Sequence, residues 1–408
     1  MATDLQYNIV GEEAVRDPHG YFGRIRDNEP VVWDANSRSW LVTSYKHVTA
    51  ALRDDKSFSS DRIMPFIRSK LSGPETDPLV RQAFEILADW LVFKDKPDHL
   101  RIRMLVNKAF SARSVAILHD RVGVICDELL GALPDDGQIN LLEDFCLPLS
   151  ATVISDMLGI PAEDRDKFEH WQRLIGPIVG AGLDDPSRYD KLARGMDELL
   201  TYCSGLLQHY REHPAPNLIT ELIEARENTQ SLSEAEIIST CTLMLFGGSE
   251  TTANLIANSI RALMLHPDQM AMMRAGKVTP QQAVEEFLRF DGSGKAVTRV
   301  VREDCDFFGH EFKKGQRVFL VLASANHDPE VFPNAGELQL DRVEGRKHIA
   351  FGYGLHVCMG SPLARLETGI AIPKILDRWS RIDFAGPLEW HAQLLARGLK
   401  SLPLEVHR

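Results

Sequence analysis

The sequence lacks the features of several large protein classes. Its six cysteines are scattered along 408 residues without a CxxC pair or a compact framework, which argues against a disulfide-stapled secreted scaffold and indicates a reducing compartment. No uncharged apolar segment reaches about 18 residues, and the N-terminus has no basic region followed by an apolar run, so neither a membrane span nor a signal peptide is indicated. We therefore expect a cytoplasmic protein.

Linkers, repeats and positive charge are also scarce. No Ser-, Gly- or Pro-rich stretch divides the chain and no segment recurs, which predicts a single domain over residues 1–408. The net charge of −12 argues against a nucleic-acid-binding protein, because such proteins usually carry a basic stripe. With 44% hydrophobic and 25% charged residues, the composition is that of a globular protein with a substantial core.

The periodicity of apolar residues predicts a mainly α fold with a minor β portion. Residues 31–33 and 40–43 have β-like composition around the turn-forming segment 34–37, which is typical of a hairpin. From about residue 100 to 290, apolar residues recur every three or four positions between Pro and Gly breaks, which predicts a succession of helices. A further strand is expected at residues 317–322.

One cysteine, Cys358, stands in a glycine-containing segment, residues 351–360, with the sequence FGYGLHVCMG. A thiolate that reaches a haem iron from a short loop needs backbone close to the porphyrin and amides turned toward sulfur, and glycines permit both. Thiolate is also the haem ligand that favours O–O cleavage. A dinucleotide-binding fingerprint fails, because it requires Gly or Ala where Val357 stands. The other alternative is a buried free cysteine, the usual role of a lone Cys.

This segment resembles the signature loop of the cytochromes P450, in which an aromatic residue, paired glycines, a basic residue and the cysteine occur at the same spacing. The resemblance covers essentially the whole chain and implies the cytochrome P450 fold of the soluble bacterial type. It also implies haem b (iron protoporphyrin IX) as the cofactor, with Cys358 as the ligand of the metal. Residues Phe351, Gly352 and Gly360 are then expected to line the cofactor site.

A long helix is predicted from Ser233 to the residue before Pro267. Ser233 and Glu236 have the spacing of a capping box, which satisfies the first amides of a helix. The adjacent Gly247 and Gly248 lie in its middle, where each costs about 1 kcal/mol relative to alanine. The resemblance implies that Gly247 faces the cofactor and that the helix is widened there to admit dioxygen and substrate.

Glu250 and Thr251, which follow these glycines, match the acid–alcohol pair of the family. Cleaving dioxygen takes two protons, so a hydroxyl near the oxygen and a carboxyl leading to solvent form a proton relay, and we assign both residues as catalytic. The alternative is a helix kink in which Thr251 or Thr252 bonds the carbonyl four residues back. The family often has aspartate where Glu250 stands, so the longer side chain of Glu250 is a departure from the usual pair.

Four residues are candidates for the haem propionates, whose burial requires cationic or hydrogen-bonding partners. His99 and Arg103 are four residues apart and share one helix face. The resemblance implies that both bind propionates, and it implies the same for Arg299 and for His356. The alternative interpretation of each of these residues, taken singly, is a solvated surface cation.

A structural role is implied for three further residues. Glu286 and Arg289 lie three residues apart on one helix face, close enough for a bidentate pair. The resemblance implies that this pair is buried and joined by a later arginine, for which Arg342 is the best match. The segment before Arg342 departs from the usual pattern of the family.

The resemblance also implies a mostly apolar substrate cavity. Two roles are open for Lys295 and for Arg397: recognition of an acidic or phenolic substrate, or that of an ordinary solvated cation. The segments that line the cavity in the family correspond here to Ile63, Met64, Phe66, Leu243, Met244, Gly247, Ala296, Val297 and Leu399.

These features predict a haem-thiolate monooxygenase that inserts one oxygen atom from O2 into a lipophilic small molecule. No flavin, NADPH or iron–sulfur segment remains, so electrons are expected from a separate ferredoxin or flavodoxin with its NAD(P)H-dependent reductase. Two alternatives stay open: a peroxide-driven haem-thiolate peroxygenase, and a non-catalytic haem-binding P450-like protein. A basic docking face for an acidic electron donor is expected from Arg101, Lys108, Arg113, Arg346 and Lys347.

Overall fold

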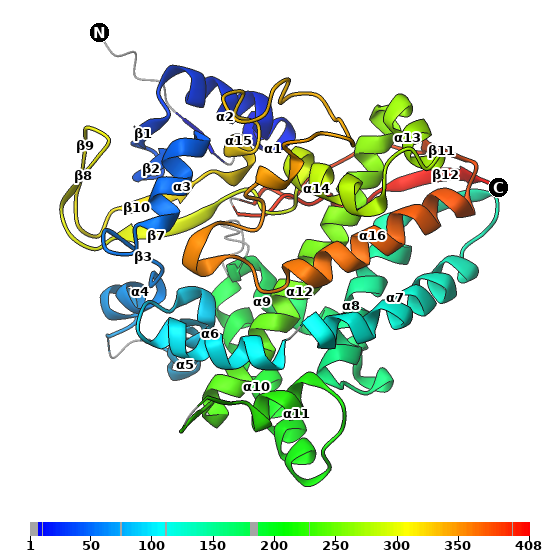
Figure 1. The fold of residues 1–408 in the computed structure, drawn as a ribbon. Helices are drawn as coiled ribbons and strands as arrows, with labels where there is room; N and C mark the ends of the chain where they lie inside the picture. The colour runs from blue at the N-terminus through cyan, green and yellow to red at the C-terminus, as the bar shows by residue number, and fades with distance from the viewer. Residues whose placement is uncertain are drawn as a thin grey trace. The chain divides into compact units, whose positions relative to one another are not determined.

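The computed structural model describes residues 7–9, 11–73, 76–110, 112–179, 187–227, 229–393 and 395–408. The chain divides into two compact units. The first unit comprises Met1–Ser59, Cys126–Pro148 and Thr251–Arg408, and the second comprises Ser60–Ile125 and Leu149–Glu250. Helices predominate in the ribbon drawing, as the sequence predicts (Figure 1).

A five-stranded sheet forms the β portion of the first unit. Its strand order is β1-β2-β10-β7-β3. Strands β1 and β2 are antiparallel, which confirms the predicted hairpin, whereas β10 is parallel to β2 and antiparallel to β7. Apolar side chains from these strands and from the helix that follows β2 build one core cluster. The strand bounds are Val31–Asp34 (β1), Ser39–Val42 (β2), Phe58–Ser59 (β3), Val297–Val301 (β7) and Arg317–Leu320 (β10).

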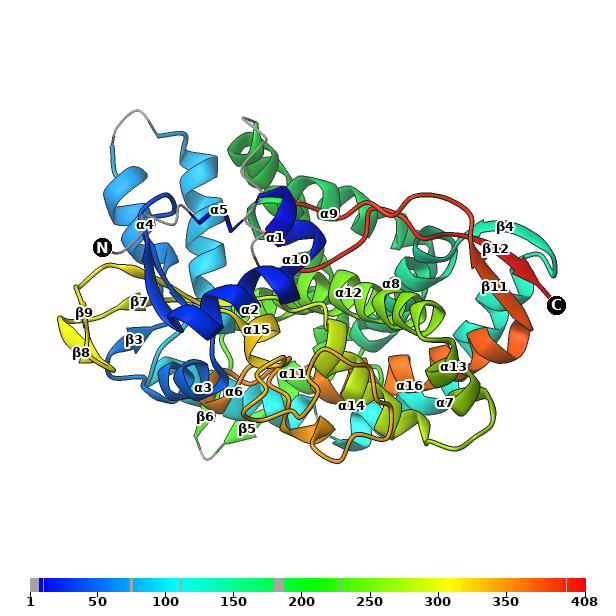
Figure 2. The same ribbon diagram turned by 90° about the horizontal axis from the view of Figure 1, so that it is seen from above.

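Smaller sheets and further helices also belong to the first unit. Figure 2 shows β4 beside β12, which pairs in turn with β11. Strands β8 and β9 form a separate hairpin. The strands are β4 (Gly137–Asn140), β8 (Cys305–Phe307), β9 (His310–Phe312), β11 (Arg381–Phe384) and β12 (Pro403–His407). The helices are α1 (Glu12–Arg16), α2 (Pro18–Asn28), α3 (Tyr45–Arg53), α13 (Pro267–Arg274), α14 (Pro280–Asp291), α15 (Leu322–Ala325) and α16 (Ser361–Arg378).

The second unit is almost entirely helical. Its helices are α4 (Ile63–Lys70), α5 (Pro78–Asp89), α6 (Asp98–Ala109), α9 (Asp166–Val179), α10 (Arg188–Glu212) and α11 (Leu218–Glu224). The short strands β5 (Arg226–Glu227) and β6 (Gln230–Ser231) pair in antiparallel fashion. The unit boundaries fall inside α7 (Ala112–Ala132), α8 (Leu147–Leu158) and α12 (Glu234–Leu265).

Helix α12 begins as its capping signal predicts. The Ser233 amide donates to Glu236 Oε2 at 2.8 Å, and the Glu236 amide donates to Ser233 Oγ at 3.3 Å. The helix continues without a break through Gly247 and Gly248. A methyl group added at Gly248 would lie 2.9 Å from Ile154 Cδ1, so close packing against α8 explains the second glycine.

Among the described residues, no helix combines the length and the apolar character that a membrane crossing requires.

Candidate functional site

The loop that carries Cys358 is a tight structure held by its own backbone. The Cys358 amide donates to the Phe351 carbonyl at 2.9 Å, which closes the loop. Gly352 and Gly354 adopt φ of 75° and 72°, in the left-handed region that favours glycine. A methyl group at Gly354 would also lie 3.1 Å from the Leu52 carbonyl. Backbone geometry therefore requires glycine at positions 352 and 354 of this loop.

Cys358 differs from the other five cysteines in its exposure. Four of them are buried and Cys305 is half-buried, whereas Cys358 is exposed. Burial raises the pKa of Cys126 and of Cys203 to about 12, so these thiols stay protonated near neutral pH. The alternative of a buried free cysteine is therefore wrong for Cys358. It carries the accessible sulfur that thiolate ligation of a haem requires.

A partly buried ion-pair network supports the cysteine loop, and sequence reasoning missed it. Glu285 on α14 accepts from Arg365 Nε at 2.6 Å and Nη2 at 3.0 Å, and His348 Nε2 lies 3.1 Å from its Oε2. Burial alone would raise the pKa of Glu285, but hydrogen bonds from His348 and Arg365 outweigh burial and lower it to about 2. The Arg365 guanidinium lies 4.7 Å from the ring centroid of Phe351, so the network reaches the cysteine loop.

Two of the expected propionate-binding residues share the first unit with Cys358. Arg299 lies on β7, is only 6% exposed, and donates from Nη1 to the Thr298 carbonyl at 2.9 Å. His356 lies in the short 3₁₀ helix Gly354–His356, inside the cysteine loop. A buried guanidinium favours an anionic neighbour, and propionates are anions of suitable size. For Arg299, the alternative of a solvated surface cation is wrong.

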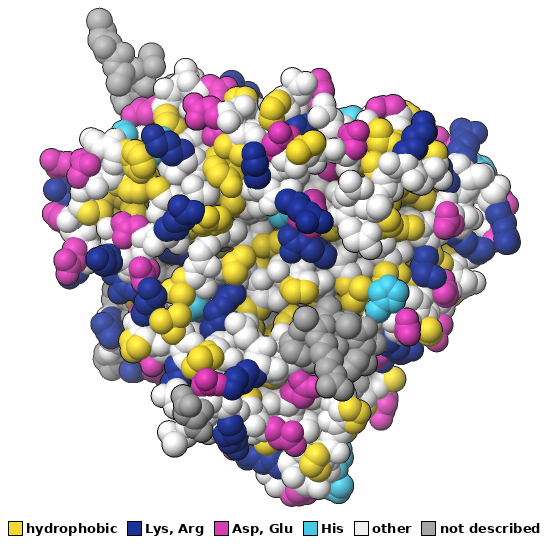
Figure 3. All heavy atoms as spheres, viewed as in Figure 1, with side chains coloured by type: hydrophobic (Ala, Val, Ile, Leu, Met, Phe, Trp, Pro, Cys, Tyr) yellow, Lys and Arg dark blue, Asp and Glu magenta, His cyan; other side chains and the backbone are white. Residues whose placement is uncertain are grey.

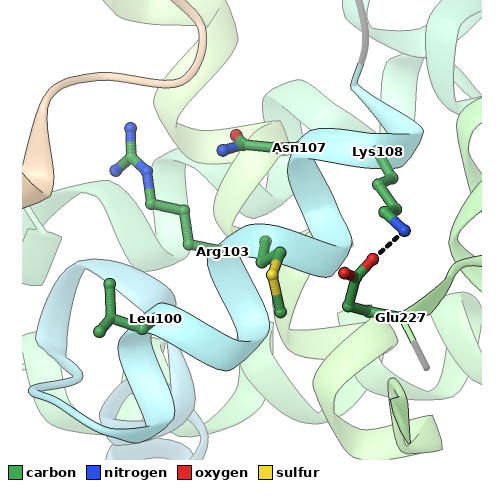
Figure 4. A pocket seen from close by; sticks show the side chains of 6 residues that line it. Leu100, Arg103, Asn107, Lys108 and Glu227 are labelled. Atoms are coloured by element: carbon green, nitrogen blue, oxygen red, sulfur yellow. Dashed lines mark ion pairs between the residues drawn. The ribbon is translucent and has the colours of Figure 1, made fainter. Parts of the chain in front are cut away.

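The other two lie on α6 of the second unit. His99 is fully buried, which excludes the alternative of a solvated cation. Figure 4 shows Arg103 and Lys108 extending to opposite sides of α6, with Lys108 paired to Glu227. Arg103 lines a cavity of about 360 Å³ together with the exposed Leu100. His99 and Arg103 therefore lie on one helix, as their spacing predicts.

The middle of α12 presents the glycine and the acid–alcohol pair. A methyl group added at Gly247 would meet no atom within 4 Å, so this glycine borders open space. Burial raises the pKa of the Glu250 carboxyl, and the side chain of Thr251 is exposed, whereas Thr252 is buried. Ser249 also bonds the carbonyl four residues back, because its Oγ donates to the Leu245 carbonyl at 3.0 Å.

Glu286, Arg289 and Arg342 lie together in the first unit. Arg289 donates from Nε and Nη2 to the two Glu286 oxygens, both at 2.7 Å, and Arg342 Nε donates to Glu286 Oε1 at 3.2 Å. The side chains of Glu286 and Arg289 are 1% and 0% exposed. Both arginines also donate to backbone carbonyls of residues 326–337, so the cluster ties α14 to that segment.

The expected cavity-lining residues are distributed over both units. In the second unit, Phe66 on α4 packs against Phe84 with ring centroids 5.1 Å apart. Four further residues of the second unit are half-buried, namely Ile63 and Met64 on α4 and Leu243 and Met244 on α12. In the first unit, Val297 begins β7, Ala296 precedes it, and Leu399 is 1% exposed.

Lys295 and Arg397 are not solvated cations, and that alternative is wrong for both. Lys295 is 3% exposed and donates from Nζ to the Gln393 carbonyl, while burial and then Arg397 lower its pKa to about 8. Arg397 is 5% exposed and donates from Nε to Asp291 at 2.5 Å. Both side chains therefore help to hold the C-terminal turn that carries Leu399.

Sequence comparison shows which known proteins this chain resembles. A family model described as Cytochrome P450 matches residues 186–276 and 280–382. A cytochrome P450 of Bacillus subtilis (strain 168) is 35% identical, covering 98% of this chain and 97% of that protein. The cytochrome P450 monooxygenase PikC of Streptomyces venezuelae is 34% identical, covering 99% of this chain and 94% of that protein.

The structural comparison agrees with the sequence comparison. The crystal structure of P450BioI in complex with hexadec-9Z-enoic acid ligated acyl carrier protein matches with a TM-score of 0.88 and 29% identity. The match covers 97% of this chain and 99% of that chain. The likeness therefore extends over the whole fold.

Proposed function

This chain belongs to the cytochrome P450 family, and we propose that it inserts one oxygen atom from O2 into a lipophilic small molecule. We propose further that its electrons come from a separate ferredoxin or flavodoxin and its reductase. The chain is a monooxygenase with a haem-thiolate cofactor, as its relatives are. The observation that carries the proposal is the exposed Cys358 in a loop closed by the Phe351 carbonyl. Substrate-dependent oxidation of NADPH, matched by product in a reconstituted system, tests it.

The chemistry of the site residues fits haem b, with residues 1–408 acting as one haem domain. Cys358 would ligate the iron, and Arg299, His356, His99 and Arg103 would neutralise the propionates. Open space beside Gly247 supports its assignment to the cofactor, and Phe351, Gly352 and Gly360 would line the loop. When bound, the group supplies the activation of dioxygen and the oxygen transfer, while the protein sets orientation and proton supply.

The protein's contribution to the reaction is the delivery of protons. A general acid must hold a proton at the working pH, and burial raises the pKa of Glu250, so it stays protonated to higher pH than an exposed glutamate. Thr251, the next residue on α12, is an exposed residue, and its hydroxyl can pass a proton onward, because a hydroxyl both donates and accepts. We assign Glu250 as the proton source and Thr251 as the donor to oxygen.

Replacing Glu250 by glutamine is expected to lower the rate of product formation by roughly 10²-fold, because an amide cannot release a proton. Thr251→Ala is expected to leave NADPH consumption intact while peroxide replaces product. The wild-type rate should be high below the raised pKa of Glu250 and fall as the pH rises through it, and Glu250→Gln should remove that fall. Product, peroxide and NADPH are measured across pH.

The matched control for the proton route is Thr252→Ala, on the same helix at the neighbouring, buried position. It should keep product and NADPH consumption coupled. Equal uncoupling in Thr251→Ala and Thr252→Ala would mean that the hydroxyl of Thr251 has a purely local role. Efficient turnover with peroxide alone in the wild type would favour a peroxygenase instead.

The substrate class rests on the character of the expected lining residues. Ile63, Met64, Phe66, Leu243 and Met244 are apolar, as are Ala296, Val297 and Leu399 of the first unit. A site of such residues gains free energy mainly by burying apolar surface of a ligand. A related structure holds a hexadecenoic acyl group on its carrier protein, which is a lipophilic ligand. We propose a lipophilic substrate here as well.

The proposed electron donor is an acidic ferredoxin or flavodoxin. Arg101 and Lys108 are ion-paired with Glu236 and Glu227, so their charges are largely neutralised, whereas Arg346 and Lys347 are exposed. The side chain of Arg113 lies outside the described residues. Figure 3 shows cationic, anionic and apolar side chains interspersed on one face, without a patch of single sign. We therefore expect the electron donor to be steered electrostatically by a few local charges, those of Arg346 and Lys347.

Charge reversal at Arg346 and Lys347 is expected to slow reduction by an acidic donor roughly 10-fold at low salt, because steering of the encounter is electrostatic. Stopped-flow reduction is measured against donor concentration and ionic strength. The difference from wild type should vanish at high salt. Arg381→Glu, at another exposed arginine, is the control and should leave the rate unchanged. Unaltered reduction of the double variant by every acidic donor would contradict the assignment.

A further inference from the structure

A second cavity, of about 430 Å³, lies in the first unit and uses none of the residues assigned to the haem. Its apolar lining consists of Val15 on α1, Leu388 and Trp390. Arg261, on the C-terminal half of α12, contributes a guanidinium to the same cavity. The remaining lining residues are the charged Glu12, Arg16, Glu389 and Lys400. A cavity that combines apolar side chains with a partly buried guanidinium can hold a small organic anion.

Arg261 belongs to a buried cluster in which positive charge exceeds negative charge. The Asp291 carboxylate is 4% exposed and lies 2.5 Å from Arg397 Nε, 3.4 Å from Arg261 Nη1 and 3.4 Å from His19 Nε2. Burial would raise the pKa of Asp291, but Arg397, His19 and Arg261 outweigh burial and lower it, so Asp291 is ionised. The single carboxylate of Asp291 thus pairs with two guanidinium groups, and that of Arg397 lies much closer to it than that of Arg261.

The donors of Arg261 are only partly used. Its contact with Asp291 is long at 3.4 Å, and its Nε is buried with no hydrogen-bond partner among the described residues. Burial lowers the pKa of Arg261 and Asp291 offsets this only in part, yet a guanidinium remains charged. A buried donor on a charged group costs free energy unless an acceptor arrives. The cluster therefore has room for one further negative charge.

Trp390 gives the cavity a flat aromatic wall. The Arg261 and Arg397 guanidinium carbons lie 5.1 Å and 3.6 Å from its ring centroid, so stacking fixes the indole in place. An antiparallel bridge joins Trp390 to Leu399, and the His391 amide donates to the Gly398 carbonyl at 3.0 Å. The wall therefore belongs to the same hairpin that carries the expected substrate-lining residue Leu399.

The rim of the cavity limits the charge that it accepts. Glu12 pairs with Arg16 at 3.5 Å and Glu389 pairs with Lys400 at 3.0 Å, with all four side chains more than half exposed. Exposed pairs contribute little free energy and rearrange easily. The charges of the two pairs cancel, so Arg261 supplies the net positive charge of the lining, which suits a monoanion better than a multiply charged anion such as phosphate. A monoanion with an apolar body fits both the rim and the interior.

We propose that this cavity binds a small carboxylic acid with a flat apolar body, whose carboxylate pairs with Arg261 and whose body packs on Val15, Leu388 and Trp390. The site is separate from the oxidation site and does not depend on the function proposed for Cys358. Planar bidentate pairing with a carboxylate is the geometry for which a guanidinium is suited. The ligand would supply the acceptor that Nε of Arg261 needs.

The test is calorimetric titration of benzoate into the haem-loaded full-length protein, with benzamide as the uncharged analogue. An azole that coordinates the iron is added first, so that the haem pocket is filled. Benzoate should still bind, and benzamide should bind at least roughly 10-fold more weakly, because it lacks the charge that strengthens the hydrogen bonds. Loss of benzoate binding on adding the azole would place it at the haem and overturn the proposal.

Variants locate the binding residue. Arg261→Gln should weaken benzoate at least roughly 10-fold, whereas Arg381→Gln, at an exposed arginine on β11, should not. Leu388→Glu, at a half-buried lining position, places a carboxylate inside the cavity and should exclude benzoate without disturbing the Asp291 cluster. Circular dichroism confirms folding of each variant. No benzoate binding to the wild type at millimolar concentration, or wild-type affinity in both Arg261→Gln and Leu388→Glu, would refute the site.

Discussion

Replacement of Cys358 by serine is expected to abolish the absorption band of the reduced carbon monoxide complex that is typical of thiolate ligation, together with detectable oxygen transfer. A serine hydroxyl is a poor substitute, because thiolate donates the electron density that favours O–O cleavage. The loop should persist, since it is closed by the amide of residue 358 and the Phe351 carbonyl at 2.9 Å, and neither group belongs to the side chain. Difference spectroscopy after reduction under carbon monoxide measures the change.

The matched control is Cys305→Ser, which changes a half-buried cysteine on β8. It should keep both the thiolate-type band and the activity. A Cys358→Ser protein that binds haem with an unchanged spectrum would show that the sulfur of residue 358 does not ligate the iron. The proposed function would then fail at its first step.

Glu286→Ala is expected to destabilise the fold by about 3–5 kcal/mol, because it leaves the buried Arg289 guanidinium without its carboxylate. Arg289 is fully buried and donates two hydrogen bonds of 2.7 Å to Glu286, which also accepts from Arg342 at 3.2 Å. The urea midpoint of unfolding measures the change. The large value reflects the cost of a buried unpaired charge, rather than the net contribution of the pair.

The control for this prediction is an exposed ion pair in the same unit. Arg381 and Asp383 have side chains 71% and 45% exposed, so Asp383→Ala should change stability by less than about 1 kcal/mol. If Glu286→Ala shifted the midpoint no more than Asp383→Ala, the cluster of Glu286, Arg289 and Arg342 would not be the structural anchor that we assign.

Local patterns in the sequence were enough for the elements near the site. The Ser233–Glu236 capping box predicted the start of α12, and both hydrogen bonds are present. Two β-like runs around a turn-forming segment predicted the β1–β2 hairpin, and the two strands pair in antiparallel fashion. Both succeed because a cap and a hairpin are decided by residues within about ten positions of one another. The cysteine loop is likewise contained in a single short segment.

Contacts between distant segments could not be predicted in this way. Glu285 and Arg365 are 80 residues apart, and Asp291 and Arg397 are 106 apart, yet each pair is in direct contact. Nothing local distinguishes Glu285 from an exposed glutamate on the same helix. The solvated-cation alternative for Lys295 and Arg397 was wrong for the same reason, because burial depends on what packs from elsewhere in the chain.

The sequence by itself determined the family, the mainly α fold and the positions of one helix cap and one hairpin, and it supplied Cys358 as the proposed haem ligand, because each is encoded by neighbouring residues. Only the tertiary structure decided which charges are buried, which partners they have and where a second cavity forms. Those properties arise when segments far apart in the chain pack together and exclude water from the same place. The free energy of a charge depends on how much water and which other charges surround it.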